Sequence, residues 1–444
     1  MDIRIRKYMA LLLMIVILLL ADACLFGSAY VVLCASEKND AAFDLGAPPK
    51  TRNRLTPDLS FGGSIALEYE LERNFDLNTK NPDDLVVWEP SLSMVFSYTP
   101  TDESTVFLNV ESSRRIVDDE KNRKNRKNSE TELELKQAFF LWKEMIDGLD
   151  LKIGRQRFKD KREWLYDEEL NGIRLFYGFS SVAFDISVSE KNDEHLLTHG
   201  NDERVTNYML YGSYVPCKNT VIAAYSFVRD DRASTKESPI FYGVHLSGEV
   251  IDNLEYWLEL AHVRGRSGSK KIRGVGFDFG STYELALPLK PSITLGFAFG
   301  SGDSEPSDDK DTNFRQTGLQ DNNAKFNGVT CLKYYGEMFN PELSNLGIFT
   351  AGLGIRPTRK TSVDVVYHYY CQHETSNEIR DSELNKNPNG LSRKLGKEID
   401  LVAGYRSKRH VKTGLSIGYF MPGKAFPHEA DGAFFVEIKI RYDF

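Results

Sequence analysis

The chain has 444 residues, 27% of them charged, and a formal net charge of −8. The acidic balance argues against a nucleic-acid-binding protein, whose footprint is usually basic. A mean hydropathy of −0.39 argues against a bundle of membrane-spanning helices. The length would allow two or three soluble domains, but no linker rich in Pro, Ser or Gly divides the chain. One large β domain fits better.

The first 35 residues have the features of an export signal. Three basic residues precede the apolar run 10–20, and A-x-A-like cleavage sites end at residues 23 and 35. We predict a signal peptide over 1–35, a periplasmic lead over 36–56 and a barrel domain over 57–444. A membrane anchor and a lipidated cysteine are the alternatives.

Stretches that alternate apolar and polar residues recur from residue 58 to Phe444. Successive strand side chains point to opposite faces, so each stretch predicts a strand with one oily and one polar face. The final stretch, AFFVEIKIRYDF, shows the cleanest alternation and ends on an aromatic residue. The expected strands are 58–72, 91–99, 104–116, 132–143, 149–158, 171–178, 181–189, 205–215, 219–228, 239–249, 253–264, 271–285, 291–300, 346–356, 360–371, 397–407, 411–420 and 432–444.

The connections between these strands alternate in length. Long loops are expected at 73–90, 117–131, 301–345 and 372–396, and short turns at 100–103, 147–148, 178–180, 216–218, 250–252, 287–290, 357–359 and 408–409. Periplasmic turns and longer external loops are typical of outer-membrane barrels. The predicted fold class is all-β: a transmembrane, antiparallel, up-and-down β-barrel of about 18 strands in the bacterial outer membrane. A barrel of this width leaves an aqueous channel.

The polar register of the strands predicts which charged side chains face the lumen. These are Lys152, Arg174, Glu255, Glu259, Glu398, Asp400, Arg406, Glu437, Lys439 and Arg441. Two interpretations remain open. The ions of a wet lumen can pair with one another, or the cations can form a ladder that guides a polyanion. Arginine suits a ladder because its planar fork binds carboxylates bidentately.

Two long blocks resemble the alginate export outer-membrane porin family. The first is LDLKIGRQRFKDKREWLYDEELNGIRL, at 149–175. The second begins FRQTGLQDNNAKFNG at residue 314 and continues through YYGEMFNPELSNLGIFTAGLGIRP to residue 357. Further matches are SVDVVYHYYCQ, GKEIDLVAGYR and GYFMPGKAF, so the resemblance covers roughly residues 57–444.

The resemblance implies a monomeric eighteen-stranded barrel that passively secretes the acidic polysaccharide alginate through an arginine-rich constriction. It implies that Arg155, Arg157 and Arg174 line the path, with Arg315 and Arg356 as further candidates. Asn171 departs from the acidic residue expected before Gly172, which removes one partner for a neighbouring arginine. The predicted path residues are therefore Lys152, Arg155, Arg157, Arg174, Arg315, Arg356, Arg406, Lys439 and Arg441.

Several loop residues allow two interpretations. Trp164 and Tyr166 can stack on sugar rings, or they can sit in an aromatic girdle or pack within the loop. The longest loop can narrow the pore, with Gln320, Asn322 and Asn323 bonding sugar hydroxyls, or it can form an ordered plug. The basic run 121–127 is expected to be a solvated loop, with binding of anionic lipopolysaccharide or polymer as the alternative. The acidic run 301–311 suggests a divalent cation, but its spacing matches no standard calcium loop. A Cys331–Cys371 disulfide is conceivable.

The expected function is a porin that passively conducts an anionic polysaccharide or small anions. The alternatives are a general small-solute uptake porin and a plugged, non-conducting surface barrel. Enzymatic activity is not expected, because His245, His262 and His368 accompany no nucleophile motif. No cofactor, metal or nucleic acid is expected. The expected partners are outer-membrane lipids, the acidic glycan or anions, and the barrel assembly machinery through Phe444.

Overall fold

The computed structural model describes residues 51, 53–121, 129–191, 205–217, 219–231, 237–407 and 410–444. The predicted signal peptide, most of the predicted lead 36–56 and nearly all of the basic run 121–127 lie outside these residues. In the described part, no helix is long and apolar enough to cross a membrane.

Eighteen long strands form the wall of a single barrel. They are β2 (Leu59–Arg73), β3 (Leu85–Thr101), β4 (Ser104–Glu120), β5 (Glu130–Ile146), β6 (Leu149–Lys159), β7 (Asp167–Phe179), β8 (Val182–Glu190), β9 (Val205–Tyr214), β10 (Val221–Asp231), β11 (Glu237–Ile251), β12 (Leu254–Ser267), β13 (Lys270–Glu284), β14 (Ser292–Gly300), β18 (Leu346–Thr358), β19 (Thr361–Gln372), β20 (Lys394–Arg406), β21 (Val411–Pro422) and β22 (Ala433–Asp443). Four two-residue strands accompany them: β1 (Asn53–Arg54), β15 (Lys310–Asp311), β16 (Asn323–Ala324) and β17 (Leu332–Lys333).

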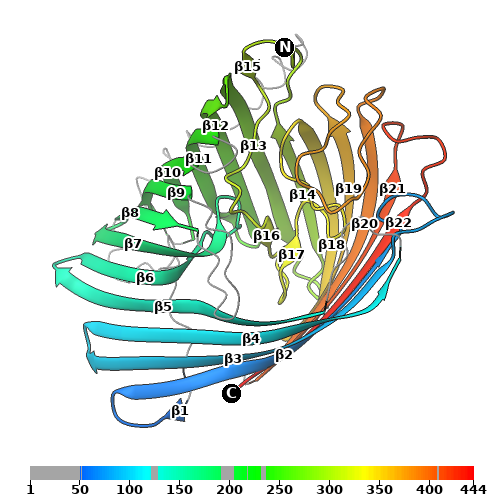
Figure 1. Cartoon of the computed structure of the whole chain (residues 1–444). Coiled ribbons are helices and arrows are strands. Elements are labelled where there is room, and N and C mark those ends of the chain that lie inside the picture. Colours follow the sequence, from blue (N-terminus) through cyan, green and yellow to red (C-terminus); the bar gives the residue numbers. More distant parts are fainter. Residues whose placement is uncertain are drawn as a thin grey trace.

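Each wall strand pairs antiparallel with its neighbours in chain order, and β14 pairs directly with β18. The first and last wall strands, β2 and β22, also pair, from Ser64 with Asp443 to Arg73 with Phe434. This pairing closes the sheet (Figure 1). The eighteen-stranded, up-and-down barrel predicted from the sequence is confirmed.

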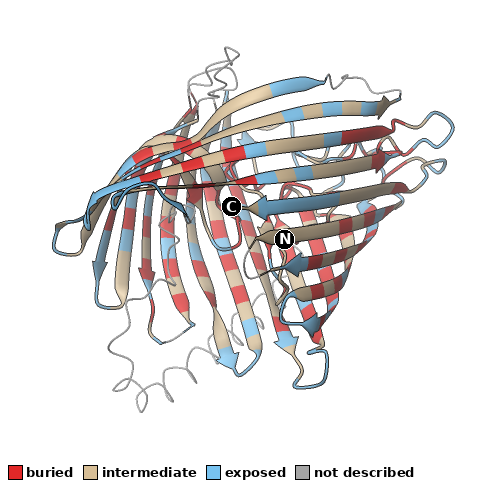
Figure 2. Cartoon of the chain, turned by 90° about the horizontal axis from the view of Figure 1, so that it is seen from below, coloured by how far each residue is buried: buried red, intermediate tan, exposed pale blue. Residues whose placement is uncertain are grey.

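The two faces of the wall differ as the alternation predicts. Along β12, Trp257, Glu259, Ala261 and Val263 are buried, whereas Leu260 between them is exposed. Figure 2 shows this alternation of burial along many strands. The outward side chains include large apolar residues, such as Leu353 and Leu295. A belt of this kind matches the hydrocarbon core of a membrane.

Two rims follow from the lengths of the connections. The turn rim carries the short connections 102–103, 147–148, 180–181, 252–253, 285–291 and 359–360, and the loop rim carries 74–84, 160–166, 301–345, 373–393 and 423–432. One connection on the loop rim, 268–269, is also short. The expected loop 73–90 is too long, because β3 begins at Leu85, and β4 and β5 likewise extend further toward the loop rim than expected.

Candidate functional site

Much of the longest loop, 301–345, lies inside the barrel: β16 and β17 are within the ring of strands, whereas β15 pairs with the loop-rim end of β13 (Figure 1). Phe314, Tyr335, Met338, Phe339 and Leu343 are each at most 1% exposed and belong to the main core cluster. Burial of this much apolar surface holds the loop against the wall. The ordered plug is therefore the arrangement that the loop adopts on one side of the lumen.

Polar wall side chains fix the loop at its centre. The backbone N–H groups of Met338 and Phe339 donate to the Glu398 carboxylate at 2.8 and 3.1 Å, and the Tyr370 hydroxyl donates to the same carboxylate at 3.0 Å. On the opposite wall, the Tyr335 hydroxyl donates to Asp278 at 3.2 Å. Buried groups that are all hydrogen-bonded in this way favour one loop conformation.

Two arginines that were predicted to line the path instead form hydrogen bonds and ion pairs that hold the long loop. Arg356 donates to the Phe326 carbonyl at 2.5 Å and to Asp364 at 2.9 Å. Arg315, 1% exposed, donates to Glu237 at 2.7 Å and to Asp311. Both side chains are buried in the described structure, which leaves little of their surface to a polymer in the lumen, and their place in the path stays a prediction. The resemblance pointed to both arginines but could not show that the loop covers them.

The end of the β6–β7 hairpin also leaves the wall. Pairing of β6 with β5 ends at Arg155, and pairing of β7 with β8 ends at Asn171, so beyond these points the two strands pair only with each other. The change occurs beside Gly154, which pairs with Gly172 and has φ +121°. A Cβ at Gly154 would lie 2.3 Å from the Ala138 carbonyl oxygen. Glycine therefore allows the bend at this position.

The bent hairpin, 156–170, packs inside the barrel and is called the ribbon below. Phe158, Trp164, Tyr166 and Leu170 are buried in the same core cluster as Tyr211 on the inner wall. Trp164 is 2% exposed and its indole N–H donates to the Tyr335 hydroxyl at 3.1 Å. Of the two interpretations for Trp164 and Tyr166, packing is therefore the correct one.

Arg174 and Lys152 face inward as predicted, but the ribbon and the wall cover them. Arg174 is 0% exposed, forms an ion pair with Asp185 at 2.5 Å, and lies over the Phe158 ring at 4.5 Å. Lys152 is 1% exposed and lies over the Phe139 ring at 4.0 Å. In the described structure neither side chain is exposed to the lumen, and their assignment to the path stays a prediction.

Arg157 lies on the other face of the ribbon and binds both oxygens of Asp167, each at 2.5 Å. Arg155 lies at the bend and is half-buried. Lys159 contacts Glu163 and, at 3.2 Å, Asp167. The carboxylates of Glu163, Asp167 and Asp321 offer oxygens within 4.8 Å of one another.

These carboxylates already have cationic neighbours: Arg157 and Lys159 on the ribbon, and Lys333, which donates to Asp321. Burial raises the pKa of Glu163 to about 7. The group is best described as a salt-bridge network that joins the ribbon to the long loop. It holds the two inserted segments in one position.

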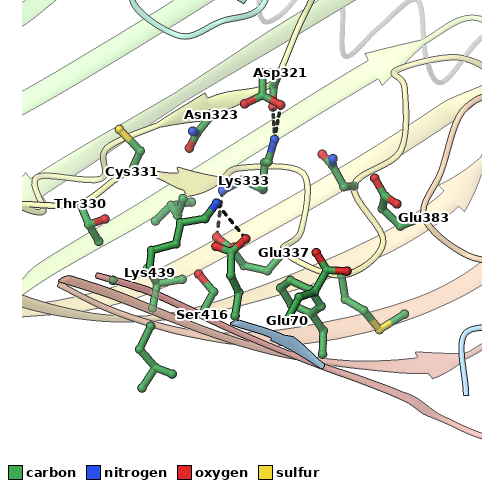
Figure 3. Close-up of a pocket in the computed structure, with 18 of the residues that line it drawn as sticks. Glu70, Asp321, Asn323, Thr330, Cys331, Lys333, Glu337, Glu383, Ser416 and Lys439 are labelled. Atoms are coloured by element: carbon green, nitrogen blue, oxygen red, sulfur yellow. Dashed lines mark hydrogen bonds and ion pairs between the residues drawn. The ribbon is translucent and has the colours of Figure 1, made fainter. Parts of the chain in front are cut away.

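An open cavity of about 550 Å³ remains beside the inserted segments. Strands β2, β21 and β22 line one side, and residues of the long loop line the other (Figure 3). Its lining includes Phe75 and Glu383 from loop-rim connections, and Lys412 and Arg441 near the turn rim. The cavity thus follows the seam where the barrel closes, and we call it the seam path.

Three cations form a row at the turn-rim end of the seam path. Arg406 pairs with Lys412 across β20 and β21, and Lys412 pairs with Arg441 across β21 and β22. Paired residues on neighbouring strands share a face and lie about 5 Å apart. Asp443 accepts from Lys412 and Arg441, each at 2.7 Å, and is the anionic neighbour of this basic row.

Carboxylates gather further toward the loop rim. Glu70 pairs with Glu437 across the seam, and Glu72 and Glu337 line the same cavity. Figure 3 shows Glu70 and Glu337 at this position. We call these four residues the acidic band. Burial, with Glu437 and Glu398 nearby, raises the pKa of Glu337 to about 7.

Lys439 lies between the two zones. Its ammonium is 2.8 Å from Glu437 and 3.5 Å from Glu68, and about half of the side chain is exposed. Of the nine predicted path residues, Lys439 and Arg441 line the cavity, and Arg406 extends the row beside it. Lys412 could have been found from the polar register of β21. Lys333 and Glu337 lie in a loop without periodicity, so no sequence pattern marked them.

The remaining side chains with predicted roles are structural. His245 bonds Glu259 and, at 2.9 Å, Ser247, and His368 bonds Thr350 at 3.0 Å. The Asn322 amide oxygen accepts from Gln316 at 2.8 Å inside the loop. Asn323 does line the cavity. Cys331 and Cys371 are free thiols, so the conceivable disulfide between them is absent.

Solved barrels of similar architecture come from Pseudomonas aeruginosa. The outer membrane protein opdK has a TM-score of 0.58 at 11% identity, covering 87% of this chain and 98% of that one. OccK11 (OpdR) has a TM-score of 0.56 at 13% identity, covering 86% of this chain and 96% of that one. These likenesses concern the fold, which is that of an outer-membrane barrel.

Comparison of sequences identifies more specific relatives than comparison of folds. The alginate production protein AlgE of Pseudomonas aeruginosa is 28% identical over 148 residues, and that of Azotobacter vinelandii is 26% identical over 159 residues. These matches cover 33% and 31% of this chain, but only 28% and 33% of the relatives' own lengths. The family model for alginate export matches residues 58–434, which include the residues of β2, β21 and the long loop that line the seam path but not Phe435, Glu437, Lys439 and Arg441 of β22. The chain therefore belongs to the alginate export family, and it is an outer-membrane β-barrel.

Proposed function

We propose that the protein passively conducts an acidic, alginate-like polysaccharide through the seam path. The observation that carries the proposal is the basic row Arg406, Lys412 and Arg441 at one end of an open cavity. Clustered cations in a low-dielectric cleft attract a polyanion and raise its rate of capture. Family membership supports uronate as the anionic group. No enzymatic step and no cofactor belong to the proposal.

The paired charges in the seam path favour movement of the polymer through the path over tight binding of the polymer within it. Two of the row cations, Lys412 and Arg441, have Asp443 as a neighbour that can replace the polymer carboxylate, and Lys439 beside the row has Glu437. An exchange between carboxylates leaves none of these cations unpaired, and so none of them binds the chain tightly. With the turn rim toward the periplasm, the polymer would enter at the basic row.

Recording from the purified barrel in planar bilayers tests the proposal. Oligouronates should interrupt the ion current, whereas neutral oligosaccharides of equal length should not. Replacing the row with Arg406→Gln, Lys412→Gln and Arg441→Gln should lower the association rate of oligouronate roughly ten-fold at low salt. Lys271→Gln, an exposed lysine on the loop rim, is the matched control.

The outcomes separate the alternatives. Current that ignores oligouronate in the unmodified protein would indicate a general small-solute porin, and absence of current would indicate a plugged barrel. The proposal extends to a monomeric barrel whose lipid-facing wall is assembled through recognition of Phe444. Light scattering in detergent and an assembly assay with Phe444→Ala test those two points.

A further inference from the structure

The seam path carries a basic row at its turn-rim end and an acidic band further toward the loop rim, and this order of charges has a consequence beyond conduction. The basic row lies at the level of Arg441 on β22, and the acidic band lies at the level of Glu437, four residues closer to the loop rim. At about 3.4 Å per residue, the two positions are about 14 Å apart along the strand. The Debye length at 0.1 M salt is about 10 Å, so the zones act separately on mobile ions.

The register of strand pairing determines which charged residues lie together in each zone. Arg406, Lys412 and Arg441 are directly paired residues of three adjacent strands. Glu70 and Glu437 are directly paired across the seam. Because strand pairing fixes the register of each row, side-chain motion cannot change the order in which the two zones follow one another along the strands.

The long loop strengthens the acidic zone from the opposite side. Glu337 lines the cavity and its backbone N–H donates to Asp400 at 3.4 Å, which holds the loop turn against the wall. Burial and, to a smaller extent, the carboxylates of Glu437 and Glu398 raise the pKa of Glu337. The acidic band therefore has contributions from both walls of the path.

We infer that the seam path is a bipolar channel: it rectifies ion current, and it captures uronate chains faster through the basic row than through the acidic band. Anions entering past the basic row meet cations entering past the acidic band, so both accumulate and the current is high. With the voltage reversed, each zone repels the ion that would have to enter through it, and the path is depleted. The capture part of the inference rests on the proposed function, whereas rectification does not.

Single-channel recording in symmetric KCl tests the inference whichever way round the barrel inserts. At 0.1 M salt the currents at opposite voltages of equal size should differ by about two-fold. At 1 M salt, where the Debye length is about 3 Å, the ratio should approach 1. A linear current at 0.1 M, or an equal ratio at both salt concentrations, would overturn the inference.

The polarity of the higher current identifies the basic end, because anions then flow from the chamber facing it. Oligouronate added to that chamber should block with the faster association rate. Faster block from the other chamber overturns the inference. Block at equal rates together with linear current refutes the inference but leaves the proposed function intact. Rectification without any block refutes only the uronate substrate.

Substitutions in the acidic band test whether its carboxylates cause the rectification. Glu70→Gln with Glu337→Gln should lower the rectification ratio toward 1, and Glu305→Gln on the exposed part of the long loop is the matched control. A ratio that stays unchanged in the double variant overturns the assignment of the acidic band. If the double variant does not assemble, the basic-row variant and the salt series on the unmodified protein still decide whether the path rectifies the current.

Discussion

Arg174 gives the sharpest test of the structure, because the family resemblance and the geometry assign it different roles. The resemblance places it in the substrate path. The structure buries it completely against Asp185, with the guanidinium over the rings of Phe158 and Phe176 at 4.5 and 4.6 Å. We therefore expect substitutions at this pair to change the stability of the barrel rather than its selectivity.

The magnitude follows from the burial of both partners. Removing one member of a buried ion pair leaves a charge without compensation and costs about 3–5 kcal/mol. Asp185→Asn should have this full effect, since two buried cations, Arg174 and Lys152, remain close to the lost carboxylate. Arg174→Met should cost less, because Lys152 still provides a counter-charge. The double variant Arg174→Met, Asp185→Asn should recover part of the loss, with a coupling of about 2 kcal/mol.

Urea unfolding of the purified barrel in detergent micelles, followed by tryptophan fluorescence, measures these free energies. Lys290→Met is the control, because Lys290 and Glu284 form an exposed pair on the turn rim whose loss should cost less than about 1 kcal/mol. The reasoning is refuted if the single variants unfold like the control. It is equally refuted if Arg174→Met leaves stability unchanged but abolishes block by oligouronate.

Three further predictions concern the bend, the loop and pH. Gly154→Ala should destabilise the barrel by about 1–3 kcal/mol or more, because its φ of +121° and the 2.3 Å approach to a carbonyl oxygen both exclude a Cβ; Gly178→Ala, which has open space at its Cβ, should be near neutral in the same urea titration. Glu398→Ala should release the long loop and raise single-channel conductance and noise, since two loop N–H groups lose their acceptor; conductance equal to that of the unmodified protein would contradict the clamp. Rectification at 0.1 M salt should rise between pH 6 and pH 8, because Glu337, with a pKa of about 7, loses its proton and adds negative charge to the acidic band; Glu337→Gln should remove this pH dependence.

The wall of the barrel could be predicted from the sequence because its pattern is local. Each strand shows its inner and outer face within about ten residues, and the outer face must be apolar whatever the neighbouring strands contain. For the same reason the inward direction of Lys152, Arg406 and Lys439 was predictable. The register alone determined it.

What covers an inward side chain was not predictable, because the covering segment comes from elsewhere in the chain. Arg174 is buried by Phe158 of the ribbon, and Arg356 by the loop carbonyl of Phe326. The bend at Gly154 was marked only by a glycine within a strand, a weak signal. Whether an inner arginine meets solvent or protein therefore depends on tertiary contacts that periodicity does not encode.

The closing seam also determines when the barrel can form. Gly63 and Phe444 exchange backbone hydrogen bonds of 3.1 and 2.9 Å, so β2 completes its pairing only when β22 is in place. Until then the sheet has two open margins with unpaired backbone groups, which are prone to join other chains. Closure of the seam removes both margins at once. The pore itself exists only after the final strand has docked, since β22 provides one wall of the passage.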